Sequence, residues 1–586
     1  MSRLVLSFAR TQKHILNGVR KYSSQPKSSS SSFKPIATAV ALLGTGSLLG
    51  YKVSKLTPDP EKGRLDRSTS PLKTLSTPQY ADEAAYNKAV ELITEVVGAE
   101  NITTDKDVLA SAADSFFNIH HPYSTTQTPL IVVYPSSTED VSQLLKIANE
   151  YRVPIVANSG LTSLEAHNMH TRGPYSISVS FQRMNKILAF HPQDLDVVVQ
   201  PGVGWQELDE WLLDREDGRN LLFGPDPGIG ANIGGMVGTS ASGTNAYKYG
   251  TMKENVINVT VVLADGTVVK TKQRPRKSAA GYDLTHLFIG SEGTLGLVTE
   301  ITLKLNVRLS LELVTVATFD TIRDAAATAQ KIITSGLQLN AVELLNTTMM
   351  SYVNKSSSAD GKEFIEKPTL FLKLGGTDKH AIDQQLKIVN GLAKENNVVK
   401  LENSSNEDEN QLLWAARRNG LWSTFEHGEH VLEDKKDVQL WVTDFAVPIS
   451  HLAQVIAETD ADLQANGFDN RYSVLGHVGD GNCHFLVVYN SKDVHKIAAI
   501  VDRMNYRAIG FGGTCTGEHS IGIGKRKYLE AELGVQAVDL MRHLKMALDP
   551  RRILNPDKVF EIDPEDTIQA HLDAGHVVEV GKPCLH

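Results

Sequence analysis

Two histidines and a carboxylate are the residues of this sequence whose types and spacing most directly indicate chemistry. The segment HVGDGNCH carries His477 and His484 at its ends and lies between two strand-like segments, Tyr472–Leu475 and Phe485–Tyr489. In one straight strand their odd separation would place the histidines on opposite faces, but the Gly-Asp-Gly-Asn turn predicts a hairpin that brings them together. With Glu518 they form a donor set that can bind a metal and leave positions open for a substrate. Because Glu518 is distant in sequence, structural histidines remain the alternative interpretation.

Three segments rich in glycine, serine and other small residues suit the binding of a polar ligand. The first, Asn158–Ser163, follows the strand-like Val153–Ala157, and small residues at a strand end let backbone N–H groups approach an anion. The second, residues 224–250, interleaves Gly, Ser and Pro with Ile, Met and Val, so it is neither a linker nor a helix. It suits a long backbone path wrapped around a ligand. The third, Gly290–Gly296, leads into a strand at Leu297–Leu305.

Spacing argues against several other kinds of site. No G-x-G-x-x-G stands between a strand and a helix with an acid about twenty residues later, so a nicotinamide site is not indicated. Gly524-Lys525 is followed by Arg526 and lacks the upstream glycine of a P-loop. The three cysteines form no CxxC pair, which argues against a disulfide framework or a zinc ribbon. They are Cys483, Cys515 and Cys584.

The small-residue segments resemble, in their order, the FAD-binding (PCMH-type) domain of the vanillyl-alcohol oxidase type over about residues 124–307. The blocks IGGMVGTSASG and GSEGTLGLVTE carry this resemblance. It implies that the FAD pyrophosphate is held by Asn158, Ser159, Gly160, Leu161, Thr162 and Ser163. It also implies a flavin environment made by Pro225, Asp226, Gly234, Gly235, Thr239, Ser242 and Gly243, closed by Glu292, Gly293, Gly296, Val298 and Asn555.

Two departures from that family pattern bear on the cofactor. The glycine triplet usual in the pyrophosphate loop is here Ser159-Gly160-Leu161, which should demand more precise backbone geometry. Leu161 also stands where covalent members carry their flavin-linking histidine. The FAD is therefore expected to be non-covalent.

Residues 309–560 resemble the C-terminal part of FAD-linked D-2-hydroxyacid dehydrogenases, through GHVGDGNCH, GEHSIGIGK and LDPRRILNPDK. The resemblance implies that His477, His484 and Glu518 coordinate a divalent metal, Zn²⁺ or Mn²⁺, which lowers the pKa of the substrate hydroxyl. It implies that His519 is the general base and that the Cα hydride passes to flavin N5. Arg417, from the helix-like WAARR, would bind the substrate carboxylate with its planar fork, and Arg418 is expected to be a solvated surface charge.

The substrate and the electron acceptor follow from a narrower resemblance, to the mitochondrial, cytochrome-linked members of this family in fungi. Relatives specific for 2-hydroxyglutarate carry Lys and Asn at the positions of Val442 and Leu486. Losing these polar partners favours D-lactate over D-2-hydroxyglutarate. An alkylglycerone-phosphate synthase, a transferase, shares the first half, but the metal set counts against it. A non-catalytic scaffold would not explain two ligand-site constellations in one chain.

The charge distribution predicts a mitochondrial leader and an acidic body. Residues 1–58 hold nine of the 59 Lys and Arg residues and none of the 68 acids, so the rest of the chain has 50 basic and 68 acidic residues and a net charge of −18. Residues 1–22 have the composition of a presequence. The apolar segment 36–53 predicts one inner-membrane span, with the body in the intermembrane space. An acidic body disfavours nucleic acid and suits the basic carrier cytochrome c.

The elements that must position these residues give an α+β fold. After the spacer, span and linker of residues 23–80, we expect a two-subdomain FAD-binding domain at 81–308. An α+β substrate (cap) domain follows at 309–586, with a C-terminal helical segment that returns to the FAD domain. Glu402–Asn410 is polar and acidic and is expected to be a mobile loop. The expected helices are Glu83–Val97, Thr138–Tyr151 with Thr138 as N-cap, Ile322–Gly336 and Ile382–Asn397. The expected strands include Leu130–Tyr134, Val261–Leu263, Val268–Lys270, Val314–Phe319 and Leu370–Leu374.

Overall fold

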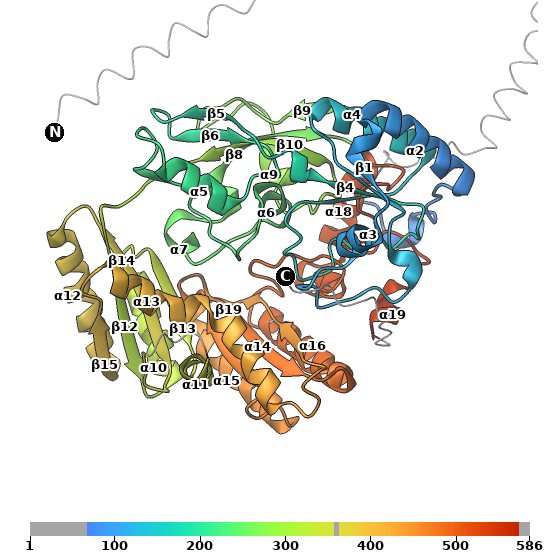
Figure 1. Cartoon of the computed structure of the whole chain (residues 1–586). Coiled ribbons are helices and arrows are strands. Elements are labelled where there is room, and N and C mark those ends of the chain that lie inside the picture. The colour runs from blue at the N-terminus through green and yellow to red at the C-terminus, as the bar shows by residue number, and fades with distance from the viewer. Residues whose placement is uncertain (1–66, 357–361, 574–586) are drawn as a thin grey trace, which may run out of the picture. The chain divides into compact units, whose positions relative to one another are not determined.

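The computed structural model describes residues 67–356 and 362–573 (Figure 1). The expected presequence (1–22) and membrane span (36–53) lie outside these ranges. Among the described residues, no helix is both long enough and apolar enough to cross a membrane. From Ser68 onward the chain forms a single unit by its internal contacts, and the sites below all lie within it.

A small, mostly parallel sheet carries the first glycine-containing segment at the end of one of its strands. Strands β2 and β3 both run parallel to β4, because α4 forms the crossover between them, and α2 packs on α4 to cover the sheet. The order is β1-β2-β4-β3. The elements are α2 (Glu83–Val97), β1 (Ile102–Thr103), α3 (Lys106–Ala113), β2 (Ile131–Val133), α4 (Thr138–Tyr151), β3 (Ile155–Asn158) and β4 (Ile177–Ser180).

A second, antiparallel sheet of order β5-β6-β10-β8-β9 completes the first half of the body. Its inner face packs against α5, α6 and α9 in one apolar core. The elements are β5 (Ile187–His191), β6 (Asp196–Val199), α5 (Trp205–Leu213), α6 (Ile233–Thr239), α7 (Ala246–Tyr249), α8 (Met252–Asn255), β8 (Val256–Val262), β9 (Val268–Lys270), α9 (Leu284–Phe288) and β10 (Leu297–Lys304). A short ladder joins β7 (Leu221–Leu222) to β11 (Asn306–Val307).

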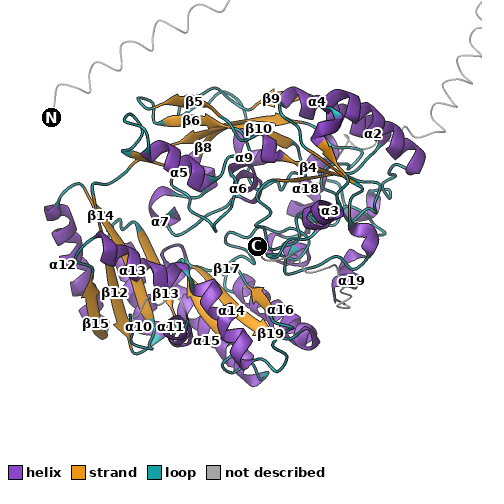
Figure 2. Ribbon diagram, in the orientation of Figure 1, coloured by secondary structure: helices purple, strands orange, loops and turns teal. Residues whose placement is uncertain are grey.

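The second half is built on one antiparallel, eight-stranded sheet of order β15-β12-β14-β13-β18-β19-β16, with β17 paired to β19 off this path (Figure 2). The strands are β12 (Leu311–Phe319), β13 (Ala341–Leu345), β14 (Thr369–Gly376), β15 (Val398–Asn403), β16 (Gln439–Val442), β17 (Phe445–Ala446), β18 (Tyr472–Gly476) and β19 (Asn482–Tyr489). Each strand presents alternate residues to opposite faces, so the two faces of the sheet pack into two different hydrophobic cores.

Different helices cover the two faces of this sheet. One face packs against α10 (Ile322–Thr334), α12 (Lys379–Glu395), α15 (Ile449–Ala465) and α16 (Val494–Gly510). The other packs against α11 (Thr347–Lys355), α13 (Glu407–Arg418) and α14 (Gly420–Val431) in a smaller core that includes Val442, Leu475 and Leu486. The candidate site lies on this second face.

The C-terminal segment crosses back to the first sheet. After α17 (Leu529–Leu533) and α18 (Val535–Leu548), Leu554 pairs in parallel with Ile155 of β3, and Asn555 N–H donates to the Ile155 carbonyl at 2.7 Å. A short helix, α19 (Ile568–Asp573), follows. Asn555 is thereby fixed next to the strand that leads into Asn158–Ser163.

Most expected elements are confirmed within a few residues, and the expected α+β fold is confirmed. Three details are wrong. Residues 224–250 were expected to form no helix, but they contain α6 and α7, because Ile233, Met236 and Val237 share one buried face at helical spacing. The N-cap of α4 is Ser137, whose hydroxyl accepts the Asp140 N–H at 3.1 Å, because Thr138 already has helical backbone. Glu402–Asn410 is not a loop: it ends β15 and starts α13 with Asn406 as N-cap. Glu402 lies in β15, and Glu407, Asp408 and Glu409 stand in the first turn of α13, where the helix dipole favours negative charge.

Candidate functional site

Polar side chains from neighbouring strands form a row on one face of the large sheet. Lys373 of β14, Glu343 of β13 and His484 of β19 occupy the same alternation as Phe371, Ala341 and Leu486, which belong to the core on that face. His477 follows the end of β18, whose Leu475 pairs in register with His484. The sheet therefore places these four groups side by side without help from flexible loops.

The two histidines and Glu518 meet as the hairpin predicts. Strands β18 and β19 pair in antiparallel fashion, and the two rings lie 5.6 Å apart. Glu518 Oε1 lies 3.2 Å from His477 Nε2 and 3.1 Å from His484 Nε2. One donor atom from each of the three residues lies within 4.8 Å of the others. The structure thus brings these three residues together, and their role as metal ligands stays a prediction.

The outer ring nitrogens determine what this cluster can hold. His484 Nδ1 donates to the Thr443 carbonyl at 2.9 Å, and His477 Nδ1 lies 2.8 Å from Glu343 Oε1. A carbonyl only accepts, so Nδ1 of His484 carries a hydrogen, and its Nε2 faces the Glu518 carboxylate at 3.1 Å. This donor set, with both outer nitrogens oriented by hydrogen bonds, fits a divalent metal such as Zn²⁺ or Mn²⁺.

The electrostatics of the cluster agree with a site for positive charge. Burial opposes a charge on His477, but Glu343 and Glu518 outweigh it and raise the pKa of that imidazole well above its usual value. Burial likewise opposes the Glu518 carboxylate, yet His477 and His484 hold its pKa well below the usual range. The cluster is arranged to keep a carboxylate ionised beside a cation.

Arg417, from α13, and His519, which directly follows Glu518, also lie beside the cluster of His477, His484 and Glu518. Arg417, in the last turn of α13, is buried, and its Nε donates to Glu343 Oε2 at 2.7 Å. Glu343 thus holds both Arg417 and His477. No hydrogen-bond partner of the two terminal guanidinium nitrogens is found among residues 67–356 and 362–573. Arg417 lines a cavity of about 680 Å³, so these nitrogens are available to a ligand carboxylate.

His519 stacks on His484 with ring centroids 5.1 Å apart. Its Nδ1 is buried and has no hydrogen-bond partner in the described part of the chain, so Nε2 is the ring nitrogen that a ligand can reach. Nε2 lies 4.0 Å from Glu518 Oε1. Burial lowers the pKa of His519 to about 4, so the ring is neutral and able to accept a proton at neutral pH.

One cavity of about 680 Å³ joins this cluster to the glycine-containing segments of the first half. All of the residues expected to bind a cofactor, a metal or the substrate line it, with the exception of Pro225, which is buried beside Asp226. Gly160 is required by close approach, because a Cβ there would lie 2.5 Å from the Gly230 carbonyl oxygen. Leu161 adopts the left-handed region at φ 54°, a strained conformation for a branched side chain that the usual glycine would avoid.

Glu292 does more than line the cavity. Its carboxylate accepts the hydroxyl of Ser520 and the backbone N–H groups of Ile521 and Gly522, each amide at 2.8 Å. It therefore ties the segment that follows His519 to the FAD-binding half. Burial opposes this carboxylate, but nearby His167 and these hydrogen bonds lower its pKa, so it stays ionised.

Several site residues were not identified from the sequence. Glu343 accepts hydrogen bonds from His477 and Arg417. In the sequence, its role was indicated only by the presence of a carboxylate inside the apolar strand AVELL. Lys373 and Trp414 also line the cavity, with the ammonium 4.2 Å from the centre of an indole ring. His167 lines the cavity as well, 3.2 Å from Glu292. None of these has a sequence spacing that links it to the others.

Both halves of the chain match known protein families. A family described as an FAD binding domain matches residues 129–272, and one described as the C-terminal domain of FAD linked oxidases matches residues 310–559. The mitochondrial D-lactate dehydrogenase (cytochrome) of Kluyveromyces lactis is 48% identical over 509 residues, which cover 86% of this chain and 87% of that protein. The corresponding Saccharomyces cerevisiae protein, D-lactate dehydrogenase (cytochrome) 1, is 46% identical over 504 residues, 85% and 84% of the two chains.

Solved structures share the fold at low identity. The 4-ethylphenol oxidase of Gulosibacter chungangensis superposes with a TM-score of 0.65 at 19% identity, over 84% of this chain and 99% of that one. An alkyldihydroxyacetonephosphate synthase gives 0.62 at 17% identity, over 83% and 88%. The family matches and the relatives identify the chain as an FAD-linked oxidoreductase. The chain belongs to the family of FAD-linked oxidases whose curated members include the D-lactate dehydrogenases (cytochrome).

Proposed function

We propose that this chain is a mitochondrial FAD-dependent dehydrogenase that oxidises D-lactate to pyruvate and passes the electrons to cytochrome c. The observation that carries the proposal is the single cavity, lined both by the small-residue loops of the first half and by Arg417, His519 and the His477 cluster. Relatives of 46–48% identity bear the name D-lactate dehydrogenase (cytochrome). The domain division proposed is 81–308 for FAD and 309–586 for substrate.

In this proposal, FAD held by the small-residue loops would supply a two-electron acceptor for the hydride of the lactate Cα. A divalent cation held by His477, His484 and Glu518 would supply the Lewis acidity that lowers the pKa of the 2-hydroxyl. The FAD is non-covalent, since Leu161 offers no linking atom.

The chain's own residues then have distinct tasks. The Arg417 guanidinium, fixed at Nε by Glu343, binds the lactate carboxylate with its free nitrogens. His519 accepts the hydroxyl proton at Nε2, and its neutral state makes this possible. One proton thus goes to His519 and one hydride leaves Cα, which converts the alcohol to the ketone with two electrons balanced.

The apolar wall of the cavity supports lactate as the substrate. Val442 of β16 pairs in register with Leu486 of β19, which is two residues beyond His484 on the same face, and both line the cavity. They offer a methyl group an apolar contact and offer a second carboxylate no hydrogen bond. This favours D-lactate over D-2-hydroxyglutarate.

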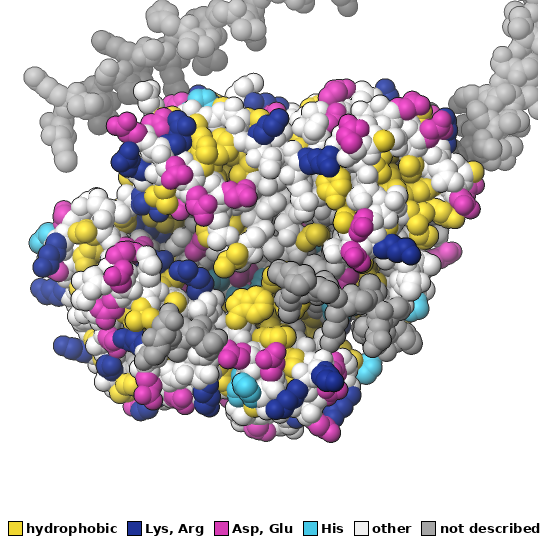
Figure 3. All heavy atoms as spheres, in the orientation of Figure 1, with side chains coloured by type: hydrophobic (Ala, Val, Ile, Leu, Met, Phe, Trp, Pro, Cys, Tyr) yellow, Lys and Arg dark blue, Asp and Glu magenta, His cyan; other side chains and the backbone are white. Residues whose placement is uncertain are grey.

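The remaining parts of the proposal concern location and acceptor. A presequence at 1–22 and a span at 36–53 would anchor the body at the inner membrane, facing the intermembrane space. There the acidic body would meet basic cytochrome c. On the face drawn in Figure 3, acidic side chains are interspersed with basic ones. Steering by net charge predicts that cytochrome c reduction slows as ionic strength rises.

A substrate panel tests the proposal. Purified, FAD-loaded protein is assayed with D-lactate, L-lactate and D-2-hydroxyglutarate, with cytochrome c and with an artificial dye as acceptors. The proposal predicts the highest kcat/KM for D-lactate with both acceptors. A higher kcat/KM for D-2-hydroxyglutarate would overturn the substrate assignment. Activity with the dye alone would overturn the acceptor assignment.

A further inference from the structure

One buried carboxylate, Asp444, fixes the backbone of both Glu518 and His519. It follows β16 and is fully buried. Its Oδ2 accepts the N–H of Glu518 and the N–H of His519, each at 2.9 Å, and the hydroxyl of Thr516 at 2.7 Å. Its Oδ1 accepts Asn482 Nδ2 at 2.7 Å. The position of Asp444 therefore sets where the proposed metal ligand and the proposed base stand.

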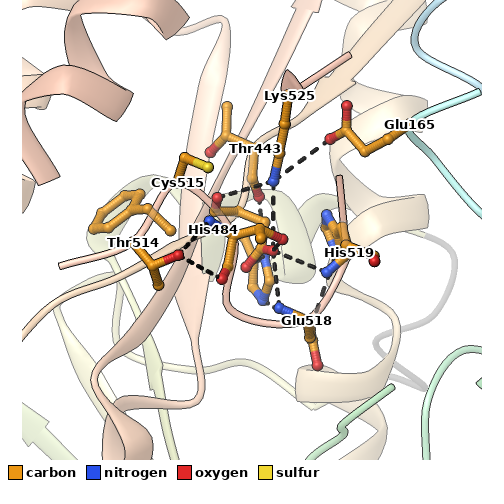
Figure 4. A network of polar contacts seen from close by, with 12 residues as sticks. Glu165, Thr443, His484, Thr514, Cys515, Glu518, His519 and Lys525 are labelled. Carbon is orange, nitrogen blue, oxygen red and sulfur yellow. Dashed lines mark hydrogen bonds and ion pairs between the residues drawn. The ribbon is translucent and has the colours of Figure 1, made fainter. Parts of the chain in front are cut away.

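A buried ammonium neutralises this carboxylate. Lys525 Nζ donates to the Asp444 carbonyl at 3.1 Å and lies 3.5 Å from Asp444 Oδ2. On its other side it lies 3.5 Å from Glu165 Oε1 (Figure 4). Burial opposes the charge on Lys525, but Asp444 and Glu165 outweigh it and raise its pKa. One cation thus bridges two buried carboxylates from different halves of the body.

Glu165 belongs to the FAD-binding half and stands two residues after Ser163. Its carbonyl accepts the Ile523 N–H at 2.8 Å. A Cβ at Gly522 would lie 2.0 Å from the Glu165 carbonyl oxygen, and a Cβ at Gly524 would lie 2.2 Å from Glu165 Oε2. The segment that carries Lys525 is therefore pressed against the end of the proposed pyrophosphate loop, with no side chain between them.

We propose that Lys525 is a positioning residue for lactate oxidation, which acts through Asp444 to set the Glu518–His519 backbone against the FAD-binding half. This inference rests on the proposed function. Without the ammonium, the buried Asp444 carboxylate loses its neighbouring cation, and the bridge from Asp444 to Glu165 in the other half is broken. Asp444 is then no longer held in place, and the Glu518 and His519 amides that it accepts shift with it relative to the cavity.

The first test is Lys525→Met in the FAD-loaded protein. The rate of flavin reduction by D-lactate, expressed per bound FAD, is expected to fall about 100-fold, the scale of a misplacement near 1 Å. The affinity for Mn²⁺, measured by electron paramagnetic resonance, is expected to weaken roughly 10-fold or more, because Glu518 moves as well. Lys558→Met is the matched control: it removes another buried lysine, whose ammonium donates to the Met169 and Pro556 carbonyls. It is expected to leave both quantities unchanged.

The second test asks whether Lys525 acts through Asp444. Asp444→Asn alone is expected to slow flavin reduction strongly, and adding Lys525→Met to it should slow the reaction less than about threefold further, because residues that act as one unit are not additive. Lys525→Arg, which keeps a cation, is expected to recover part of the lost rate.

Three results would overturn the proposal. The first is a Lys525→Met rate per bound FAD within threefold of wild type. The second is full additivity of the two substitutions. The third is that Lys525→Met and Lys525→Arg both lose FAD or unfold in part, while the fraction of each variant that keeps its FAD reacts at the wild-type rate. That result would give Lys525 a structural role only. Failure of the proposed function is distinguished by the wild-type protein, whose flavin would then not be reduced by D-lactate at all.

Discussion

Replacing Glu343 with glutamine should disable the site although this residue is expected to touch neither substrate nor metal. Its carboxylate accepts His477 Nδ1–H at 2.8 Å on one oxygen and Arg417 Nε–H at 2.7 Å on the other. A glutamine of the same shape keeps one accepting oxygen and presents an NH₂ group to the other donor. One buried donor is left without an acceptor, and either the metal-binding ring or the carboxylate clamp loses its orientation.

The magnitude follows from that lost hydrogen bond. A buried donor left unsatisfied costs about 1–3 kcal/mol, and each 1.36 kcal/mol is tenfold in rate. Loss of a partner that orients a metal ligand costs roughly 10–100-fold in metal affinity or activity. Both estimates predict a fall of about 10–100-fold in kcat/KM for D-lactate.

The assay is steady-state oxidation of D-lactate with an artificial acceptor, at measured FAD and metal content. Glu402→Gln is the matched control: Glu402 lies on the edge strand β15 and pairs with Lys362 and Lys400, away from the cavity. It should change kcat/KM less than threefold. A Glu343→Gln enzyme with near wild-type kcat/KM would show that the Glu343 bridge does not orient the site.

Three further perturbations test other parts of the site. Arg417→Lys replaces a bidentate fork with a point charge and removes the Nε contact to Glu343, so KM for D-lactate should rise about 10-fold or more in steady-state assays, and an unchanged KM would exclude Arg417 as the carboxylate clamp. Dialysis against a chelator should abolish turnover while the flavin spectrum persists, because the expected metal ligands and the expected flavin residues come from different halves. Adding Mn²⁺ or Zn²⁺ should restore turnover. Full activity in metal-free protein would show that the metal has no part in the mechanism. The pair Val442→Lys with Leu486→Asn should move kcat/KM toward D-2-hydroxyglutarate by at least 10-fold, and an unchanged ratio would show that these two positions do not set specificity.

The sequence predicted the parts of this protein that depend on local pattern. The helix Glu83–Val97 was located to the residue from its apolar spacing, and the structure shows Asp82 as its N-cap. The hairpin that joins His477 to His484 followed from the turn between two apolar strands. The small-residue segments supply about half of the residues that line the cavity, because close backbone approach restricts which residues can stand there.

Long-range polar contacts were beyond sequence reasoning. Glu343 and Arg417 are 74 residues apart, and Lys525 meets Asp444 across 81 residues. No local periodicity connects such pairs; they meet because the order of strands in the large sheet is not the order in the chain. The same limit explains the error at Glu402–Asn410, where acidic composition suggested a loop. Asn410 there is buried and bonds to the backbone of β12 at Val314, a contact that only the tertiary fold supplies.

Anaerobic rapid mixing of the FAD- and metal-loaded protein with D-lactate tests the central claim most directly, namely that one cavity holds the flavin and the hydroxy acid together. The account predicts that flavin absorbance bleaches within a single turnover, that D-lactate deuterated at C2 bleaches it more slowly, and that L-lactate leaves it unchanged. A flavin that stays oxidised with saturating D-lactate, in protein shown to hold both FAD and metal, would contradict the account.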